Sequence, residues 1–223
     1  MLLYAITDRN SLAGNCGECE RILLSLAAQW SAGGVDYIQV REKDLPVAAL
    51  ISLAAGIVRA CRQSGGSTQV FVNSRPDSAA GILAGSGANG VHLTGGLSAE
   101  QLAAAISLIR RSFAASTPVS VSCHSTEEVS AAASAGATLA LFAPVFHKNI
   151  PGKGATCGVG LDLLAAACRA GHQGAAERAL PVLALGGVTV ENANQCAAAG
   201  AAGVASIRLF LGEGWRRLRE TNP

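Results

Sequence analysis

The residues best suited to chemistry follow a short apolar segment at positions 35–44, Val-Asp-Tyr-Ile-Gln-Val-Arg-Glu-Lys-Asp. Its first half is rich in the β-branched and aromatic residues of a buried strand, and Arg41 and Lys43 come directly after it. Two cations at the end of a strand could hold an anion on a rigid scaffold. The same pattern is also typical of a strand followed by a solvated charged loop, so this segment alone leaves both interpretations open.

A histidine and a serine follow another β-rich segment, in the run Val121-Ser-Cys-His124. His124 could transfer a proton near neutral pH, because the ordinary pKa of an imidazole lies in that range. His92 lies inside a β-rich segment and could equally be a hydrogen-bonded structural histidine.

Small residues follow the last two β-rich segments, in Leu-Gly-Gly-Val at 185–188 and Val-Ala-Ser-Ile at 204–207. Glycine allows the backbone to approach an anion, and backbone amides at a helix amino terminus favour phosphate. We therefore expect a phosphate site formed by Gly186, Gly187, Ser206 and Ile207. A tight turn explains the Gly-Gly pair equally simply.

Residues 146–160 form the longest segment without a regular pattern, and they contain Lys148 and Lys153. A glycine-rich loop with two cations is typical of a lid that closes over a charged substrate. A surface loop without a function is the alternative.

The elements that position these residues alternate regularly along the chain. Helical segments with 3.6-residue spacing separate eight β-rich segments, at 2–6, 35–40, 69–73, 90–93, 118–122, 138–143, 181–185 and 202–206. Strict alternation predicts a parallel sheet, and eight units without a linker favour a closed (β/α)8 TIM barrel over an open doubly wound sheet. In such a barrel the polar residues after the strands converge on one pocket. The candidate substrate contacts are then Gln39, Arg41, Lys43, Asn73, Arg75, His92, Lys148 and Lys153.

Composition limits the class of protein. The 223 residues are 50% apolar and 14% charged, which argues against disorder. The formal charge of +2 is too small to indicate a protein that binds nucleic acid. No apolar run reaches the length of a membrane span, and the first residues lack the pattern of a signal peptide. Seven scattered cysteines indicate reduced thiols. We expect a cytoplasmic protein with a single barrel domain over residues 1–223, compatible with a homodimer.

Several motifs, taken in order, resemble those of the thiamine phosphate synthase and thiazole tautomerase superfamily. The matching segments are 4–9, 37–44, Asn73 with Asp77, 90–93, 121–124, 144–146, 185–188 and 203–205. The resemblance implies the (β/α)8 barrel independently of the strand count. It also implies a thiamine-biosynthesis enzyme that joins a pyrimidine diphosphate to a thiazole phosphate with release of pyrophosphate.

The resemblance further assigns roles to individual residues. It places Gln39, Arg41, Lys43 and Asn73 against the pyrimidine diphosphate and Ser122 near its reactive centre. Gly187, Ser206 and Ile207 would hold the thiazole phosphate. Magnesium, together with Arg and Lys side chains, would stabilise the departing pyrophosphate. We expect Lys43, Ser122 and His124 to be the catalytic residues.

The sequence departs from the synthase pattern at both acidic positions. Ser74 stands where synthases have Asp, and Thr-Gly-Gly-Leu at 94–97, around Gly96, replaces a Gly-Gln-acidic-Asp run. A hydroxyl and backbone carbonyls replace two carboxylates poorly as magnesium ligands, so we assign no residue as a metal ligand. Lys-Asn-Ile at 148–150 also stands where the synthases have a phosphate-binding segment that is rich in Thr and contains Lys.

These departures favour the tautomerase branch, in which a histidine matching His124 moves a proton in a thiazole carboxylate phosphate without a diphosphate or metal. Lys43 is retained here, although tautomerases have usually lost it. Three functions therefore remain: a synthase with magnesium, which we predict, a tautomerase without a cofactor, and a divergent barrel that only binds phosphate.

Overall fold

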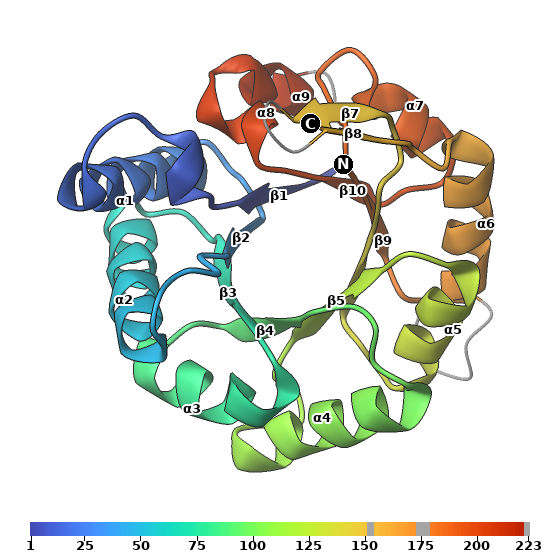
Figure 1. The fold of residues 1–223 in the computed structure, drawn as a ribbon, viewed down its shortest axis with the longest axis horizontal. Helices are drawn as coiled ribbons and strands as arrows, with labels where there is room; N and C mark the ends of the chain where they lie inside the picture. The colour runs from blue at the N-terminus through green and yellow to red at the C-terminus, as the bar shows by residue number, and fades with distance from the viewer. Residues whose placement is uncertain (151–153, 173–178, 221–223) are drawn as a thin grey trace.

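The computed structural model of the chain describes residues 1–150, 154–172 and 179–220. Eight parallel strands form a closed barrel in the order β1-β10-β9-β6-β5-β4-β3-β2 (Figure 1). They are β1 (Leu2–Ile6), β2 (Tyr37–Val40), β3 (Gln69–Ser74), β4 (Gly90–Leu93), β5 (Val119–Cys123), β6 (Leu139–Phe142), β9 (Val182–Leu185) and β10 (Gly203–Ser206). The predicted (β/α)8 barrel is confirmed, and each strand lies within two residues of its predicted bounds.

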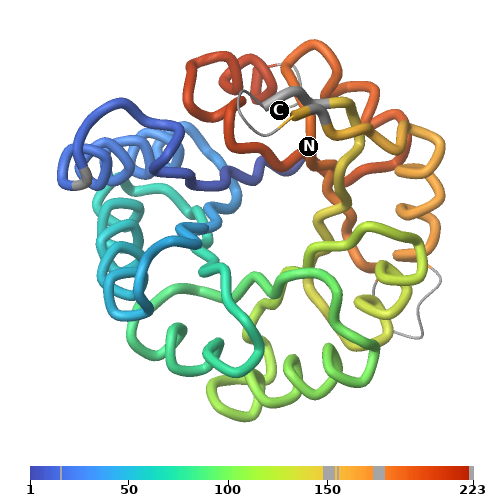
Figure 2. The backbone as a smooth tube through the Cα atoms, in the orientation of Figure 1, coloured from blue at the N-terminus to red at the C-terminus, as the bar shows by residue number. Residues whose placement is uncertain are grey.

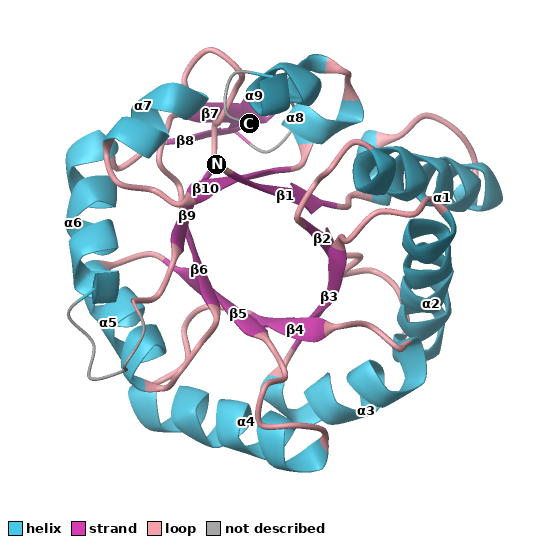
Figure 3. Cartoon of the chain, turned by 180° about the vertical axis from the view of Figure 1, so that it is seen from behind, coloured by secondary structure: helices cyan, strands magenta, loops and turns pink. Residues whose placement is uncertain are grey.

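Helices surround the strands on all sides, as the views from front and back show (Figures 1 and 3). They are α1 (Cys16–Ala32), α2 (Val47–Gln63), α3 (Pro76–Ser86), α4 (Ala99–Ser112), α5 (Thr126–Ser134), α6 (Leu161–His172), α7 (Ala193–Ala198), α8 (Arg208–Leu211) and α9 (Arg217–Glu220), with short 3-10 turns at Arg9–Ser11 and Gly214–Arg216. Within the described ranges, no helix has the length and apolar character needed to cross a membrane.

Local signals at the helix ends explain these bounds. Ser98 and Gln101 form a capping box at the start of α4, and the Ser125 side chain accepts a hydrogen bond from the Glu128 amide at the start of α5. After α3 the chain turns at Gly87, whose φ of +64° is a left-handed conformation that favours glycine. Both features rest on local sequence signals, a serine three residues before Gln or Glu at the start of a helix and a glycine directly after the end of one.

Two apolar layers enclose the sheet. One lies between the strands and the helices, and the other fills the inside of the barrel with Tyr4, Ile6, Phe71, Leu139, Leu141, Leu183 and Ala205. Side chains of a strand alternate between these faces, so a residue two positions after an inward one also points inward. Asn73 therefore shares the inward face with Phe71. By the same rule Gln39 and Arg41 share it with Tyr37, which packs against the inner layer.

The barrel closes where the first and last strands lie side by side (Figure 2). Trp30 Nε1 of α1 donates a hydrogen bond of 2.9 Å to the Phe210 carbonyl of α8. Arg219 of α9 forms an ion pair with Asp36, whose carboxylate also accepts a hydrogen bond of 2.7 Å from the Leu3 amide. These contacts tie the end of the chain to the start of β1 and β2.

The segment at 146–160 is not irregular throughout, so that expectation is wrong in part. Strands β7 (Lys148–Ile150) and β8 (Gly154–Thr156) pair antiparallel as a small separate sheet. Each strand has only three residues, too few for an alternating apolar pattern to be visible in the sequence. Lys148 begins β7, and Lys153 lies outside the described residues.

Candidate active site at the barrel mouth

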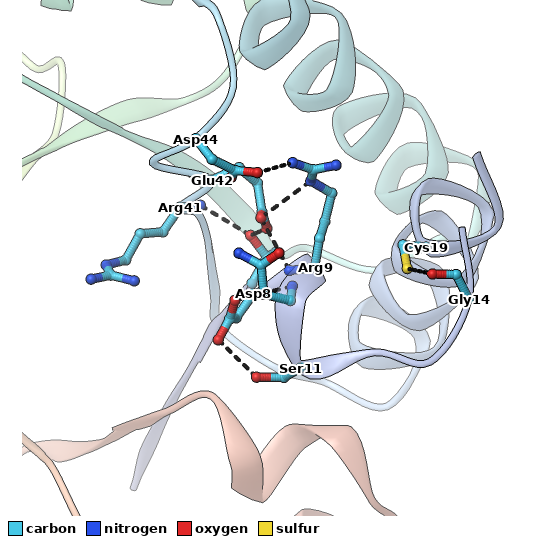
Figure 4. A network of polar contacts seen from close by, with 10 residues as sticks. Asp8, Arg9, Ser11, Gly14, Cys19, Arg41, Glu42 and Asp44 are labelled. Carbon is cyan, nitrogen blue, oxygen red and sulfur yellow. Dashed lines mark hydrogen bonds and ion pairs between the residues drawn. The ribbon is translucent and has the colours of Figure 1, made fainter. Parts of the chain in front are cut away.

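The acidic residues of the 41–44 segment are engaged in holding the barrel rim together. Glu42, only 4% exposed, accepts hydrogen bonds from Thr7 Oγ1 at 2.6 Å and from the Arg9 amide at 3.0 Å. The Arg9 guanidinium lies 3.4 Å from Glu42 and bonds Asp44 at 2.8 Å (Figure 4). Burial raises the pKa of Glu42, while the bonds from Thr7 and Arg9 oppose that rise. The run of charged residues at 41–44 did not reveal this network in the sequence, because Arg9 is 33 residues away from Glu42 in the chain.

Arg41 differs from its acidic neighbours. Its backbone amide donates to Thr7 Oγ1 at 3.0 Å, which fixes the residue, while its side chain extends away from the Arg9 network (Figure 4). Within the described part of the chain, no acidic side chain forms an ion pair with Arg41. Arg41 is half-buried, and its charge is therefore available to an anion at the mouth of the barrel, the end at which the parallel strands finish. Lys43, two residues further, is exposed on the same rim.

Gln39 and Asn73 form a pair at the ends of β2 and β3. Gln39 is 1% exposed, and its Nε2 atom donates to Asn73 Oδ1 at 3.2 Å. The bond orients the Asn73 amide so that its Nδ2 group remains a donor. Because Asn73 is half-buried, that donor can meet a ligand at the mouth.

His92 lies between two serines of β5. It is 2% exposed, with Nδ1 at 2.9 Å from Ser120 Oγ and Nε2 at 2.8 Å from Ser122 Oγ. Burial lowers the pKa of His92 to about 3, and the positive charge of Arg41 contributes, so the ring is neutral at physiological pH. Both ring nitrogens of His92 have serine partners, so the ring lies beneath Ser122. Ser122 itself is half-buried and lies at the surface of the mouth. A direct contact of His92 with substrate stays a prediction.

His124 is exposed at the rim after β5. Its Nδ1 atom lies 2.7 Å from the Ala143 carbonyl, and because a carbonyl only accepts, Nδ1 carries a hydrogen; in the neutral ring Nε2 then has the lone pair. Its amide donates to Glu128 at 2.6 Å. Next to the ring lies Gly95, where a Cβ atom would approach His124 Nε2 to 3.3 Å. Gly95 and Ser122 line one cavity of about 280 Å³ between α4 and α5.

The two positions that lack the expected acids offer no carboxylate to a magnesium ion. Ser74 is 4% exposed, donates to the Arg75 carbonyl at 2.7 Å and lies 3.2 Å from Ser78 Oγ of α3. Gly96 has a φ of +82°, and the side chain of Arg75 is exposed. Across the described residues, no three His, Cys, Asp or Glu side chains gather to hold a metal ion. The side chains present do not fit magnesium bound by carboxylates.

The predicted phosphate segments end adjacent strands, β9 and β10. Gly186 and Gly187 have φ of +95° and +68°, and a Cβ atom at Gly187 would lie 2.8 Å from the His147 carbonyl oxygen. Glycine is therefore required by conformation and by space. Helix α7 begins only at Ala193, so Gly186 and Gly187 are not at a helix amino terminus, contrary to our expectation.

Ser206 and Ile207 do precede a helix, the four-residue α8. Ser206 is 8% exposed and its Oγ atom accepts a hydrogen bond of 3.3 Å from the Leu209 amide. Phosphate binding by the four residues at the ends of β9 and β10 stays a prediction.

The inner partners of His92 were not among the candidate site residues. Ser120 is 0% exposed and lies opposite His92 in the register of β4 and β5. Tyr4 Oη lies 3.2 Å from Ser120 Oγ. The alternation of side chains along a strand could have revealed Ser120. It precedes Ser122 by two residues in an otherwise apolar strand, so both serines point to the inside of the barrel.

Comparison with known proteins agrees with this geometry. A family model described as thiamine monophosphate synthase matches residues 3–210. A putative thiamine-phosphate synthase of Geobacter sulfurreducens is 36% identical over 95% of this chain and 87% of its own length. A thiamine-phosphate synthase of Roseiflexus castenholzii is 33% identical over 95% of this chain and 81% of its own length.

Solved structures support the fold. A thiamine phosphate pyrophosphorylase from Pyrococcus furiosus superimposes with a TM-score of 0.72 at 23% identity, covering 98% of this chain and 94% of that one. A 3-hexulose-6-phosphate synthase gives a TM-score of 0.65 at 19% identity, covering 99% and 97%. At such identities these likenesses concern the barrel alone. The family match and the two relatives show that the chain belongs to the thiamine monophosphate synthase family.

Proposed function

We propose that the chain joins a pyrimidine diphosphate to a thiazole phosphate and releases pyrophosphate. Family membership makes it a thiamine phosphate synthase-like transferase. The observation that carries the proposal is the convergence of Gln39, Asn73, His92 and Ser122 from four neighbouring strands, next to Arg41, which has no acidic partner among the described residues.

The reaction breaks the bond between the methylene carbon of the pyrimidine and the bridging diphosphate oxygen, whose electron pair leaves with pyrophosphate. The thiazole nitrogen then supplies the electron pair of the new carbon–nitrogen bond. Arg41 and Lys43 are the groups we assign to the growing negative charge of the leaving group. Oriented donors act without reorganisation during the reaction, and the backbone of Arg41 is held by the hydrogen bond from its amide to Thr7 Oγ1.

Asn73 and Ser122 are the groups we assign to the pyrimidine diphosphate and its reactive carbon. The Gln39–Asn73 bond supports an oriented amide donor, and the His92–Ser122 bond supports a fixed hydroxyl. The thiazole phosphate would bind at Gly186, Gly187, Ser206 and Ile207. Lys148 and Arg75 are further candidate contacts to the phosphates.

We assign none of these steps to magnesium. Ser74 and the segment around Gly96 carry no carboxylate, and Ser74 Oγ already donates to the Arg75 carbonyl. We therefore assign the charge of the pyrophosphate to Arg41 and Lys43, and a requirement for magnesium becomes a separate question for the assay.

The test is a reaction of the purified chain with both substrates, with and without magnesium, following thiamine phosphate and pyrophosphate. Arg41→Gln is expected to lower kcat/KM by about 100-fold or more, because a charged hydrogen bond to the leaving group is lost. Arg59→Gln removes the same charge from the exposed outer side of α2 and is the matched control. Equal activity of Arg41→Gln and Arg59→Gln would contradict the role of Arg41.

A thiazole tautomerase is the second candidate, and the geometry of His124 favours it. Its Nδ1–H is held by the Ala143 carbonyl, so in the neutral ring Nε2 is the nitrogen that can accept a proton at the rim. Such an enzyme would accelerate proton exchange in a thiazole carboxylate phosphate without metal or diphosphate. His124→Gln should abolish that exchange, whereas His172→Gln, an exposed residue at the end of α6, should not.

A barrel that only binds phosphate is distinguished by the same samples. Thiazole phosphate would raise the melting temperature of the chain while neither reaction proceeds.

A further inference from the structure

Four side chains, Tyr4, Ser120, His92 and Ser122, form a series of hydrogen bonds that runs from the apolar interior of the barrel to its mouth. We call this series the relay. It runs from Tyr4 Oη to Ser120 Oγ at 3.2 Å, from Ser120 Oγ to His92 Nδ1 at 2.9 Å and from His92 Nε2 to Ser122 Oγ at 2.8 Å. Tyr4 and Ser120 are both 0% exposed, and only Ser122 at the far end is half-buried. Four groups in series can share their hydrogens in two opposite directions.

Only one direction gives every buried hydrogen an acceptor. If Ser120 donated to Tyr4, the phenolic hydrogen of Tyr4 would need a second acceptor, and the described residues provide none. A buried donor without a partner is costly, so Tyr4 donates to Ser120. Burial raises the pKa of Tyr4, which keeps its hydroxyl protonated.

The remaining hydrogens then follow in order. Ser120 has one hydrogen, and it donates to His92 Nδ1. A neutral imidazole carries its hydrogen on the other nitrogen, so His92 Nε2–H donates to Ser122 Oγ. The hydroxyl hydrogen of Ser122 is left to point into the mouth.

We infer that Tyr4, Ser120 and His92 are positioning residues that fix Ser122 as a hydrogen-bond donor toward the diphosphate of the substrate. The inference rests on the proposed function and adds the direction of the Ser122 hydrogen bond to it. It also separates Ser122 from a serine nucleophile, because His92 Nε2 already carries a hydrogen and cannot take one from Ser122. Ser122 Oγ therefore assists the departure of pyrophosphate by donation and forms no covalent intermediate.

The first test concerns the resting protein and needs no reaction. Nitrogen-15 NMR of histidine-labelled protein distinguishes a ring nitrogen that carries hydrogen from one that does not. His92 is assigned by removing His124, His147 and His172 in turn, all of which are exposed. The expected form of His92 has hydrogen on Nε2 and none on Nδ1. Hydrogen on Nδ1 would overturn the inference, whatever reaction the chain catalyses.

The second test is kinetic. Tyr4→Phe removes only the hydroxyl that begins the relay. It is expected to lower kcat about 2- to 10-fold with unchanged KM, because one hydrogen bond is lost. In a Ser122→Ala background the same substitution should have no effect, since Ser122 is the group through which Tyr4 acts. Equal effects of Tyr4→Phe in both backgrounds would refute the positioning role.

The matched control is Tyr37→Phe. Tyr37 is the second tyrosine of the chain, its ring lies 5.6 Å from that of Tyr4, and it packs against the same Phe71. Its hydroxyl is not a member of the relay. Tyr37→Phe should leave kcat unchanged, and a loss equal to that of Tyr4→Phe would show that ring packing, and not the relay, causes the effect. If neither thiamine phosphate nor pyrophosphate forms in the native protein, the proposed function fails, while the NMR result still decides the direction of the relay.

Discussion

Gln39 of β2 and Asn73 of β3 are joined across neighbouring strands by a hydrogen bond of 3.2 Å from Gln39 Nε2 to Asn73 Oδ1. Gln39 is almost fully buried, whereas Asn73 reaches the mouth of the barrel. The buried partner therefore sets the direction in which the exposed partner can donate.

Truncation of the buried partner should affect one substrate only. Gln39→Ala is expected to raise KM for the pyrimidine diphosphate by about 5- to 100-fold, because Asn73 loses its orientation and Oδ1 its partner. KM for the thiazole phosphate should change little. Steady-state kinetics with each substrate varied in turn measures both, and Gln63→Ala at the exposed end of α2 is the control. A parallel rise for both substrates would contradict the assignment.

Loss of the Glu42 charge should destabilise the rim of the barrel. Glu42→Gln keeps the shape but weakens the bonds to Thr7, the Arg9 amide and the Arg9 guanidinium, so the free energy of unfolding should fall by about 1–3 kcal/mol. Asp44→Asn removes the other partner of Arg9, but that side chain is 52% exposed, and the loss should stay below about 1 kcal/mol. Urea unfolding of the two variants measures the difference, and equal losses would rule out the buried network.

The neutral state of His92 should appear in the dependence of stability on pH. Its pKa is lowered to about 3 in the folded chain, but in the unfolded chain it takes up a proton near its ordinary value. Between those values the unfolded state binds more protons, so stability falls as pH falls, by about 1.4 kcal/mol per pH unit below pH 6. His92→Gln should lack this contribution. Urea unfolding from pH 7 to pH 4.5 tests the difference in slope, and the contribution of Glu42 cancels because both proteins carry it. Parallel curves would show that His92 is not buried neutral.

Carboxylates at the two altered positions should create a dependence on magnesium. By the resemblance to the synthase pattern, the missing acids correspond to Ser74 and to Leu97, the last residue of Thr-Gly-Gly-Leu at 94–97. Leu97 is a better site than Gly96, since the φ of +82° at Gly96 strains any side chain. The double variant Ser74→Asp/Leu97→Asp is expected to increase turnover with added magnesium. Each single variant is a control, and a turnover that does not respond to magnesium would contradict the interpretation.

The barrel could be predicted from the sequence because each unit carries its own signals. The alternation of β-rich and helical segments and the Ser98–Gln101 cap are local patterns, and they do not depend on the rest of the fold. The strand ends also brought Gln39, Asn73, His92 and Ser122 into one candidate group, because parallel strands in a barrel end on the same side.

The partners of these residues could not be predicted, since they depend on register and on contacts distant in sequence. Arg41 and Glu42 are adjacent, yet alternation sends Glu42 to Arg9 and leaves Arg41 at the mouth. Ser120 becomes a partner of His92 only through the pairing of β4 with β5. The short strands β7 and β8 were missed because three residues carry too little pattern.

The most direct measurement is the stoichiometry of the reaction with both substrates. We predict that the chain forms thiamine phosphate and pyrophosphate in equal amounts, and that Arg41→Gln loses both products together while Arg59→Gln retains them. Thiazole phosphate that is bound but not consumed, in an assay where an active control synthase forms both products, would contradict the proposed function.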